Sequence, residues 1–364
     1  MNRAALAFLI CTPLACGASA HGAYTQTFAE GERAETAGRF AEASVHYDGA
    51  AKVAPNARER DHASYAAAKM LLQAGDLAAA APRLEAIASA TPPGEHAALA
   101  YYDLTEFKMR HGREAEAWVA LERMVVAYPA SALARRALHR VITHKDETEG
   151  LKASLAYIDS RSATLGKSDL AETLAYERAL HLEQLGDHAA ARAAFIAVAE
   201  KWPYPLGALR DDSLFHASEI DEALGHFPEA ISDLEAMLRD REKASTIGTY
   251  QRPRYTPAQW RIAILYRDQL HDRSRAREAF HFLYTDFTTA LQRDDALWEE
   301  ASLWAEDNDK TTACSRLATL THAFPDSRYV PCAIEDCSAI QRASGSHAPK
   351  TCHAYLRAHP RDPR

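Results

Sequence analysis

Four cysteines near the C-terminal end carry the side chains most able to do chemistry, at Cys314, Cys332, Cys337 and Cys352. Such thiols can oxidise to disulfides, or they can bind zinc with help from His347 and His353. An even number of cysteines favours disulfides in an exported chain. If residues 332–337 are helical, Cys332 and Cys337 point about 140° apart and need different partners. We therefore favour pairing Cys314 with Cys337 and Cys332 with Cys352, and we expect no metal site.

The first twenty residues predict that the chain is exported. Asn2-Arg3 forms a short charged start, residues 4–10 are apolar, and Ala18-Ser19-Ala20 is a small-residue cleavage site. We expect residues 1–20 to be a signal peptide and the mature chain to begin at His21. Removal of this leader takes away two further cysteines, Cys11 and Cys16, and leaves the four above.

A lipoprotein signal is the alternative reading of the same leader. Cys16 follows Leu14-Ala15 and would carry a lipid after cleavage, although Pro13 stands where the lipoprotein motif has Leu. No later segment approaches the roughly 18 apolar residues that a membrane span needs. We therefore expect a mature chain without a transmembrane span, either free or held by a lipid on Cys16.

Catalytic motifs are missing from the rest of the sequence. It has no Gly-rich phosphate loop, no nucleophile elbow and no His pair flanking a Glu on one helical turn. The 17 His residues are scattered singly along the chain. The formal charge of −8, with Arg dispersed among Glu and Asp, argues against nucleic acid as the main partner. We expect no enzymatic activity and no cofactor.

A sequence phrase recurs every 34 to 39 residues along most of the chain. A turn is followed by Ala, by a bulky residue four positions on, by an apolar residue, and then by Pro. Spacing of four places two side chains on one face of a helix, and Pro ends a helix. The small residues, each expected at the start of a second helix, are Ala43, Ala80, Ala117, Ala191, Ala230, Ala279 and Ala313. Their bulky partners are Tyr47, Leu84, Leu121, Phe195, Leu234, Leu283 and Leu317.

This repetition predicts an all-α fold in which about nine helical hairpins stack into one α-solenoid over residues 21–364. The least regular unit covers residues 131–167, with a charged turn at residues 144–147. We expect a weak division at the irregular stretch 243–257. Residues 311–364 should form a C-terminal cap stapled by the disulfides, because a terminal repeat has a neighbour on one side only.

The Ala, the bulky residue and the Pro fall in register in six units, and this pattern resembles the tetratricopeptide repeat. The resemblance implies a right-handed solenoid with a concave groove. Phrases such as Tyr128-Pro129-Ala130-Ser131 and Phe324-Pro325-Asp326-Ser327 resemble those of bacterial envelope tetratricopeptide proteins. That group includes the barrel-assembly lipoprotein and a periplasmic coordinator of cell division, and this chain has more repeats than either. The resemblance implies a location in the periplasm, or on the periplasmic face of the outer membrane, of a Gram-negative bacterium.

Projection of the units in register places one residue of each first helix in the implied groove. Six of these seven residues are aromatic, and the seventh is Ile264; the six are Phe28, Tyr65, Tyr102, Tyr176, Phe215 and Trp298. Rigid rings in a row can hold a segment of another protein. The alternative is that the rings pack between successive first helices as core.

Other groove positions are mainly acidic and would attract a partner of basic character. These positions are Glu32, Glu35, Glu106, Glu183, Asp212, Glu219, Glu222, Asp268, Asp272, Asp295 and Glu306. The alternative is a solvated acidic face. Taken together, the sequence predicts a non-catalytic scaffold in the bacterial envelope that binds a protein or peptide segment. Two alternatives stay open: a lipid-anchored assembly factor for outer-membrane or cell-wall machinery, and a regulatory subunit of an envelope enzyme.

Overall fold

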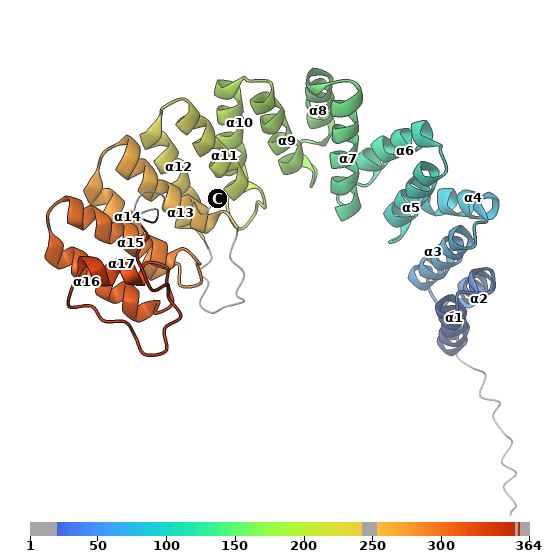
Figure 1. Ribbon diagram of the computed structural model, residues 1–364. Coiled ribbons are helices and arrows are strands. Elements are labelled where there is room, and N and C mark those ends of the chain that lie inside the picture. Colours follow the sequence, from blue (N-terminus) through green and yellow to red (C-terminus); the bar gives the residue numbers. More distant parts are fainter. Residues whose placement is uncertain (1–19, 242–252, 354–355, 357–364) are drawn as a thin grey trace, which may run out of the picture. The chain divides into compact units, whose positions relative to one another are not determined.

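The computed structural model describes residues 20–241, 253–353 and 356 (Figure 1). These residues form seventeen α-helices and no strand, so the expected all-α fold is confirmed for the part of the chain that is described. The expected leader, apart from Ala20, and the alternative lipid site Cys16 lie outside these residues. Pro360, expected to end the last unit, lies outside them as well.

The described helices belong to two compact units, which divide after Thr148. In the first unit, three hairpins are followed by the helix α7. The bounds are α1 Ala20–Thr36, α2 Phe40–Val53, α3 Ala57–Gln73, α4 Leu77–Ala88, α5 Ala97–Arg110, α6 Glu114–Ala127 and α7 Ala132–Thr148.

The second unit begins with helix α8 and continues through four hairpins to a short last helix (Figure 1). The bounds are α8 Leu151–Leu165, α9 Ala171–Gln184, α10 His188–Lys201, α11 Arg210–Ala223, α12 Phe227–Arg239, α13 Tyr255–Ile264, η1 Leu265–Gln269, α14 Arg273–Asp286, α15 Arg293–Glu306, α16 Lys310–Ala323 and α17 Val330–Asp336. The sequence predicted a weak division at 243–257; residues 243–252 of that stretch lie outside the described part, so this division stays a prediction.

The turn expected at residues 144–147 is wrong, because helix α7 continues through it to Thr148. The charged residues of this stretch are held by α6. The ring of His144 stacks on Trp118 with centroids 3.9 Å apart, and Lys145 Nζ lies 3.4 Å from Glu122 Oε1. Trp118 and Glu122 are one helical turn apart, so together they hold one more turn of α7. The break comes instead at Gly150, whose φ of 87° suits a residue without a Cβ.

The recurring small and bulky residues form the core between paired helices. Ala43, Ala80, Ala117, Ala191 and Ala230 are all fully buried, as expected for places where helices approach closely. The second helices begin at a side-chain cap in several hairpins, where an aspartate accepts from the amide three residues on. These caps are Asp76, Asp187, Asp272 and Asp309. A cap of this kind satisfies amides that have no partner inside the helix.

The register of the seventh unit differs from the prediction by three residues. The position four residues after its cap, Asp272, is occupied by Ala276 and not by Ala279. The bulky residue that follows is Phe280, and both Ala276 and Phe280 are fully buried. Leu283 is also buried, so both registers place a bulky apolar residue in the core. The pattern of apolar residues along α14 therefore does not show which register is correct.

A π-helical turn moves the first helix of this unit by one further residue. Residues Leu265–Gln269 form the turn, and the amide of Leu270 donates to the carbonyl of Leu265, five residues earlier. A π turn adds one residue to a helix without changing the periodic pattern on either side of it. In the other units, the shared aromatic residue lies a fixed number of positions before the residue that caps the second helix. The same count back from Asp272 reaches residue 261, and the extra residue of the π turn moves the equivalent position to Trp260.

The C-terminal cap contains the two disulfides in the pairing that the sequence favoured. Cys314 is joined to Cys337 and Cys332 to Cys352, with Cα–Cα distances of 5.7 and 4.6 Å. The assumption that residues 332–337 are helical is correct only in part, since α17 ends at Asp336 and Cys337 has an extended backbone. In place of the expected ninth hairpin, α17 packs on α16, and residues 337–353 are non-helical.

Candidate functional site

The six predicted aromatic residues all lie against neighbouring helices. In the first unit, the Tyr65 hydroxyl donates to Asp103 of the next hairpin at 2.6 Å, and its ring lies 4.9 Å from that of His96. Arg140 of α7 donates to the Tyr102 hydroxyl at 3.2 Å. The Phe28 ring contacts Tyr47 within its own hairpin and His62 in the next, both at 4.8 Å. These three rings join successive repeats of the first unit.

The rings of the second unit are used in the same way. Tyr176 packs edge-on against His216 of the next hairpin at 6.1 Å, and Phe215 lies beneath the guanidinium of Arg254 at 4.5 Å. Trp298 stacks on Tyr329 with centroids 4.8 Å apart. Tyr65, Tyr102 and Trp298 are only 5–8% exposed. Their contacts are those of core between repeats, and a direct role in partner binding stays a prediction.

Sequence reasoning placed Ile264 where the structure places Trp260. The Trp260 ring packs on Phe280 at 5.2 Å and is 6% exposed. The position is therefore aromatic in all seven units that were projected in register. A π turn leaves no mark in residue types, but the spacing of 12 residues from Trp260 to Asp272, against 11 from Tyr176 to Asp187, could have revealed it.

Most of the predicted acidic groove residues are engaged with cations of the same chain. Glu106 pairs with Arg140, Asp212 with Arg254, and Glu222 with Arg261. Asp295 is not a groove residue at all, since it is fully buried. It accepts from the Tyr329 hydroxyl at 2.9 Å and from Arg328 at 3.0 Å. These pairs neutralise much of the field that the sequence suggested for a basic partner.

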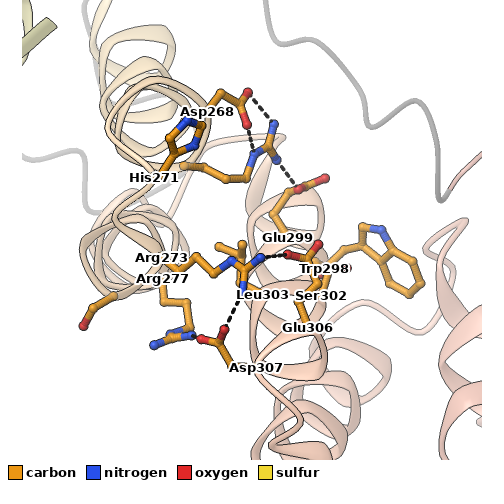
Figure 2. Close-up of a pocket in the computed structure, with 12 residues that line it drawn as sticks. Asp268, His271, Arg273, Arg277, Trp298, Glu299, Ser302, Leu303, Glu306 and Asp307 are labelled. Carbon is orange, nitrogen blue, oxygen red and sulfur yellow. Dashed lines mark hydrogen bonds and ion pairs between the residues drawn. The ribbon is translucent and has the colours of Figure 1, made fainter.

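A polar pocket of about 730 Å³ opens between the π turn, α14 and α15 in the second unit (Figure 2). Its lining is Arg267, Asp268, His271, Arg273, Ser274, Arg277, Trp298, Glu299, Ser302, Leu303, Glu306 and Asp307. Among these residues, Asp268, Glu306 and Trp298 were predicted from the sequence. The arginines, Glu299 and Asp307 were not, because their residue types are ordinary on a protein surface until the hairpins bring them together.

Arg267 connects the π turn to the floor of this pocket. Its guanidinium donates to both carboxylate oxygens of Asp268, at 2.7 and 3.0 Å, and to Glu299 at 2.5 Å. Glu299 is 7% exposed. Burial raises the pKa of its carboxyl to about 7, Arg267 opposes the rise, and the charge of nearby Asp295 adds to it. Burial therefore outweighs the ion pair at this carboxyl.

The opposite wall of the pocket is a second set of ion pairs, visible in Figure 2. Arg273 donates to Asp307 at 2.7 Å, and Arg277 pairs with the other oxygen of the same carboxylate. The Arg277 guanidinium also lies over the Trp304 ring at 4.0 Å. A guanidinium held by a carboxylate and an aromatic face has few conformations left, so this wall is preorganised.

Two turn residues beside the pocket have positive φ, at a position that glycine occupies in the other repeats. The residue before the second-helix cap has positive φ at Gly38, Gly75, Gly112, Gly186 and Gly225. In the last two hairpins it is His271, with φ 52°, and Asn308, with φ 64°. A side chain in this conformation costs about 1 kcal/mol or more. His271 in a glycine position is the sequence signal that could have drawn attention to this site.

An apolar pocket of about 380 Å³ adjoins the polar one on the other side of α15. It is lined by Trp298, Ala301, Ser302, Ala305, Glu306, Lys310, Ala313, Cys314, Leu317, Asp336 and Cys337. The Cys314–Cys337 disulfide therefore forms part of its wall. Three alanines leave the space that larger side chains would fill.

Two further observations concern the described residues only. No group of three or more His, Cys, Asp or Glu among them is arranged to hold a metal ion. None of the described helices has both the length and the apolar character that a membrane crossing requires.

No protein-family model matches the sequence, and no curated protein matches it significantly. Among solved structures, pilF of Pseudomonas aeruginosa is 17% identical, with 67% of this chain and 98% of that chain covered and a TM-score of 0.37. YrrB, described as a TPR protein with an unusual peptide-binding site, is 14% identical, with coverage of 57% and 93% and a TM-score of 0.35. The C-terminal part of a TPR repeat-containing protein from Cytophaga hutchinsonii is 10% identical, with coverage of 85% and 98% and a TM-score of 0.35. At these identities and TM-scores, the similarities assign no partner and no activity to the chain.

Proposed function

We propose that this chain is a non-catalytic scaffold of the tetratricopeptide type, exported to the bacterial envelope, that binds a protein or peptide segment. The observation that carries the proposal is the pair of adjoining pockets along α15, one polar and one apolar. Their walls are set in advance by ion pairs and by a disulfide. A preorganised surface loses little side-chain entropy when a segment binds to it.

The envelope location rests on the leader and the cysteines. Disulfides persist in oxidising compartments, and all four cysteines that remain after residue 20 are paired. Mass spectrometry of the mature N-terminus tests this part of the proposal. A free His21 supports soluble export, whereas a diacylglyceryl Cys16 supports the lipid-anchored alternative. An uncleaved Met1 in fractionated cells would contradict both.

Binding is tested by affinity capture from an envelope extract, followed by measurement of the affinity of each recovered protein in purified form. Purified wild-type chain should retain at least one protein that binds it at a saturable site. A variant with the exposed Ala305 changed to Leu should retain less of it, because the leucine fills the apolar pocket. The matched control is Ala189→Leu on α10, which adds the same side chain to an exposed helix surface outside both pockets. Equal capture by all three chains would argue against binding at α15.

A further inference from the structure

One stripe of α15 separates the two pockets. Trp298, Ser302 and Glu306 are spaced four residues apart, so they lie on one face of the helix, and all three line both pockets. In Figure 2 the Trp298 indole points away from the Arg273 and Arg277 pairs. The two pockets are therefore compartments of one groove, which we call the α15 groove, and an occupant can reach both at once.

The polar compartment has one more carboxyl group than it has guanidinium groups. Its lining contains three guanidinium groups, Arg267, Arg273 and Arg277, and four carboxylates, Asp268, Glu299, Glu306 and Asp307. Each arginine already has a carboxylate partner: Arg267 donates to Asp268 and Glu299, whereas Arg273 and Arg277 both pair with Asp307. His271 also lines the compartment.

The carboxylate that remains after these pairs is Glu306, on the boundary between the compartments. Its side chain is 56% exposed, more than that of Asp268 at 45% or Asp307 at 33%. Arg273 reaches it only at 3.5 Å, because the same guanidinium makes its 2.7 Å hydrogen bond to Asp307. Glu306 is thus the carboxylate with the most capacity left for an incoming cation.

The apolar compartment begins next to Glu306 and has room for an aliphatic or aromatic side chain. Its floor is made by Trp298, Ala301, Ala313 and Leu317, all of which are at most 5% exposed. The charged groups on its rim beyond Glu306 are Lys310 and Asp336, which are of opposite sign. Burial of an apolar side chain here would favour binding, because it removes apolar surface from water.

We propose that the α15 groove binds an extended peptide segment of a partner protein that carries an apolar side chain close to a lysine or arginine. The apolar side chain enters the compartment beside the Cys314–Cys337 disulfide, and the cation pairs with Glu306. This inference rests on the proposed function and names the class of segment that the scaffold recognises. It also locates the preference for basic residues in one carboxylate instead of a general acidic field.

Selection from a library of random displayed peptides tests the proposal on the full oxidised chain, with synthetic peptides from the selection used as probes. The recovered peptides should be enriched in Leu, Ile, Met or Phe within three residues of Lys or Arg. Ala305→Leu should weaken their binding about tenfold or more, since it fills the apolar compartment. Glu306→Lys should weaken it about three- to tenfold at low salt, and the loss should shrink as salt rises.

Controls separate folding from recognition. Ala189→Leu and Glu200→Lys make the same changes at exposed positions of α10 and should leave binding within about twofold of wild type. On Glu306→Lys, a renewed selection should favour Asp or Glu near the apolar residue, which a misfolded variant could not produce.

The possible results distinguish this inference from the function that it refines. Peptides that bind wild type, Ala305→Leu and Glu306→Lys equally well would overturn the inference and leave peptide binding intact. Peptides without a basic residue that compete for the same compartment would also overturn it. Recovery of no binding peptide by the wild-type chain would overturn both the inference and the proposed function.

Discussion

The indole of Trp260 packs edge-on against the ring of Phe280, with centroids 5.2 Å apart and ring planes at 71°. Tyr176 and Phe195 make the equivalent contact in an earlier hairpin, at 5.7 Å and 63°. The contact recurs although the sequence spacing differs by one residue, from 19 between Tyr176 and Phe195 to 20 between Trp260 and Phe280. The π turn absorbs the additional residue, so packing is kept and local helix geometry changes.

Trp260→Ala should therefore be far more destabilising than Ile264→Ala. Loss of a buried tryptophan costs about 3–5 kcal/mol, whereas Ile264 is half-buried and should cost at most about half as much. Urea unfolding followed by circular dichroism measures both. A larger loss for Ile264→Ala would mean that Ile264, and not Trp260, holds the shared position.

His271→Gly should stabilise the second unit, because glycine adopts positive φ without the steric cost that a Cβ imposes. The expected gain is up to about 1 kcal/mol. His271→Ala keeps the Cβ and should give no gain. Gly225→Ala is the reverse control, since φ there is 79° and no atom lies within 4 Å of the added Cβ. That variant should lose about 1 kcal/mol through backbone strain alone. Thermal unfolding of the three variants would contradict this account if His271→Gly were the least stable.

Peptide mapping without reduction should recover Cys314 linked to Cys337 and Cys332 linked to Cys352. The denatured, unreduced mature chain should then show no reactive thiol. Removal of either bridge by paired Cys→Ala substitution should cost about 3 kcal/mol, since each closes a loop of similar length, with sequence separations of 23 and 20. Four reactive thiols, or a Cys332–Cys337 link, would refute the pairing.

Glu299 should make the stability of the second unit fall as pH rises from about 4.5 to about 7. Its pKa is raised by burial to about 7 in the folded chain, so the folded state prefers the protonated carboxyl. The resulting stabilisation is complete below the ordinary pKa of a glutamate and is lost as pH rises through the folded pKa. Relative to wild type, Glu299→Gln should gain no more than about 3 kcal/mol across this range. Asp268 continues to hold Arg267 in the variant.

The matched control for this pH dependence is Asp233→Asn. Burial raises the pKa of Asp233 to about 6, with Arg192 opposing the rise and Asp221 adding to it. The gain of this variant should therefore be complete near pH 6, about one pH unit below that of Glu299→Gln. Urea unfolding at a series of pH values distinguishes the two. Identical pH profiles would show that neither carboxyl is the source.

The helical repeats were predictable because each follows from local chemistry. An aspartate cap, a glycine with positive φ before it and an alanine four residues after it are all present in the sequence at Gly75, Asp76 and Ala80. The prediction was wrong where an interaction between helices decided the outcome. At residues 144–147, stacking on Trp118 extends a helix that the charged sequence alone would have ended.

Only some residues of the candidate groove could be predicted from the sequence. Trp298 and Glu306 were predicted from periodicity, but their partners lie about thirty positions away in the chain: Tyr329 stacks on Trp298, and Arg273 pairs with Glu306. The sequence does not show which carboxylate a given arginine will pair with, since that depends on which helix faces pack together. The apolar pocket arises from small residues on α15 and α16, and in the sequence such residues are indistinguishable from those that allow close helix packing.

The sequence by itself determined an all-α chain of repeated hairpins and a favoured pairing of four cysteines, because capping, periodicity and helical spacing act over a few residues. Tertiary structure decided the register of the seventh unit, the burial of Asp295 and the joining of two pockets along α15. Those features depend on contacts between helices, where burial and charge pairing outweigh local preference. For the same reason, Trp260 and not Ile264 occupies the shared aromatic position.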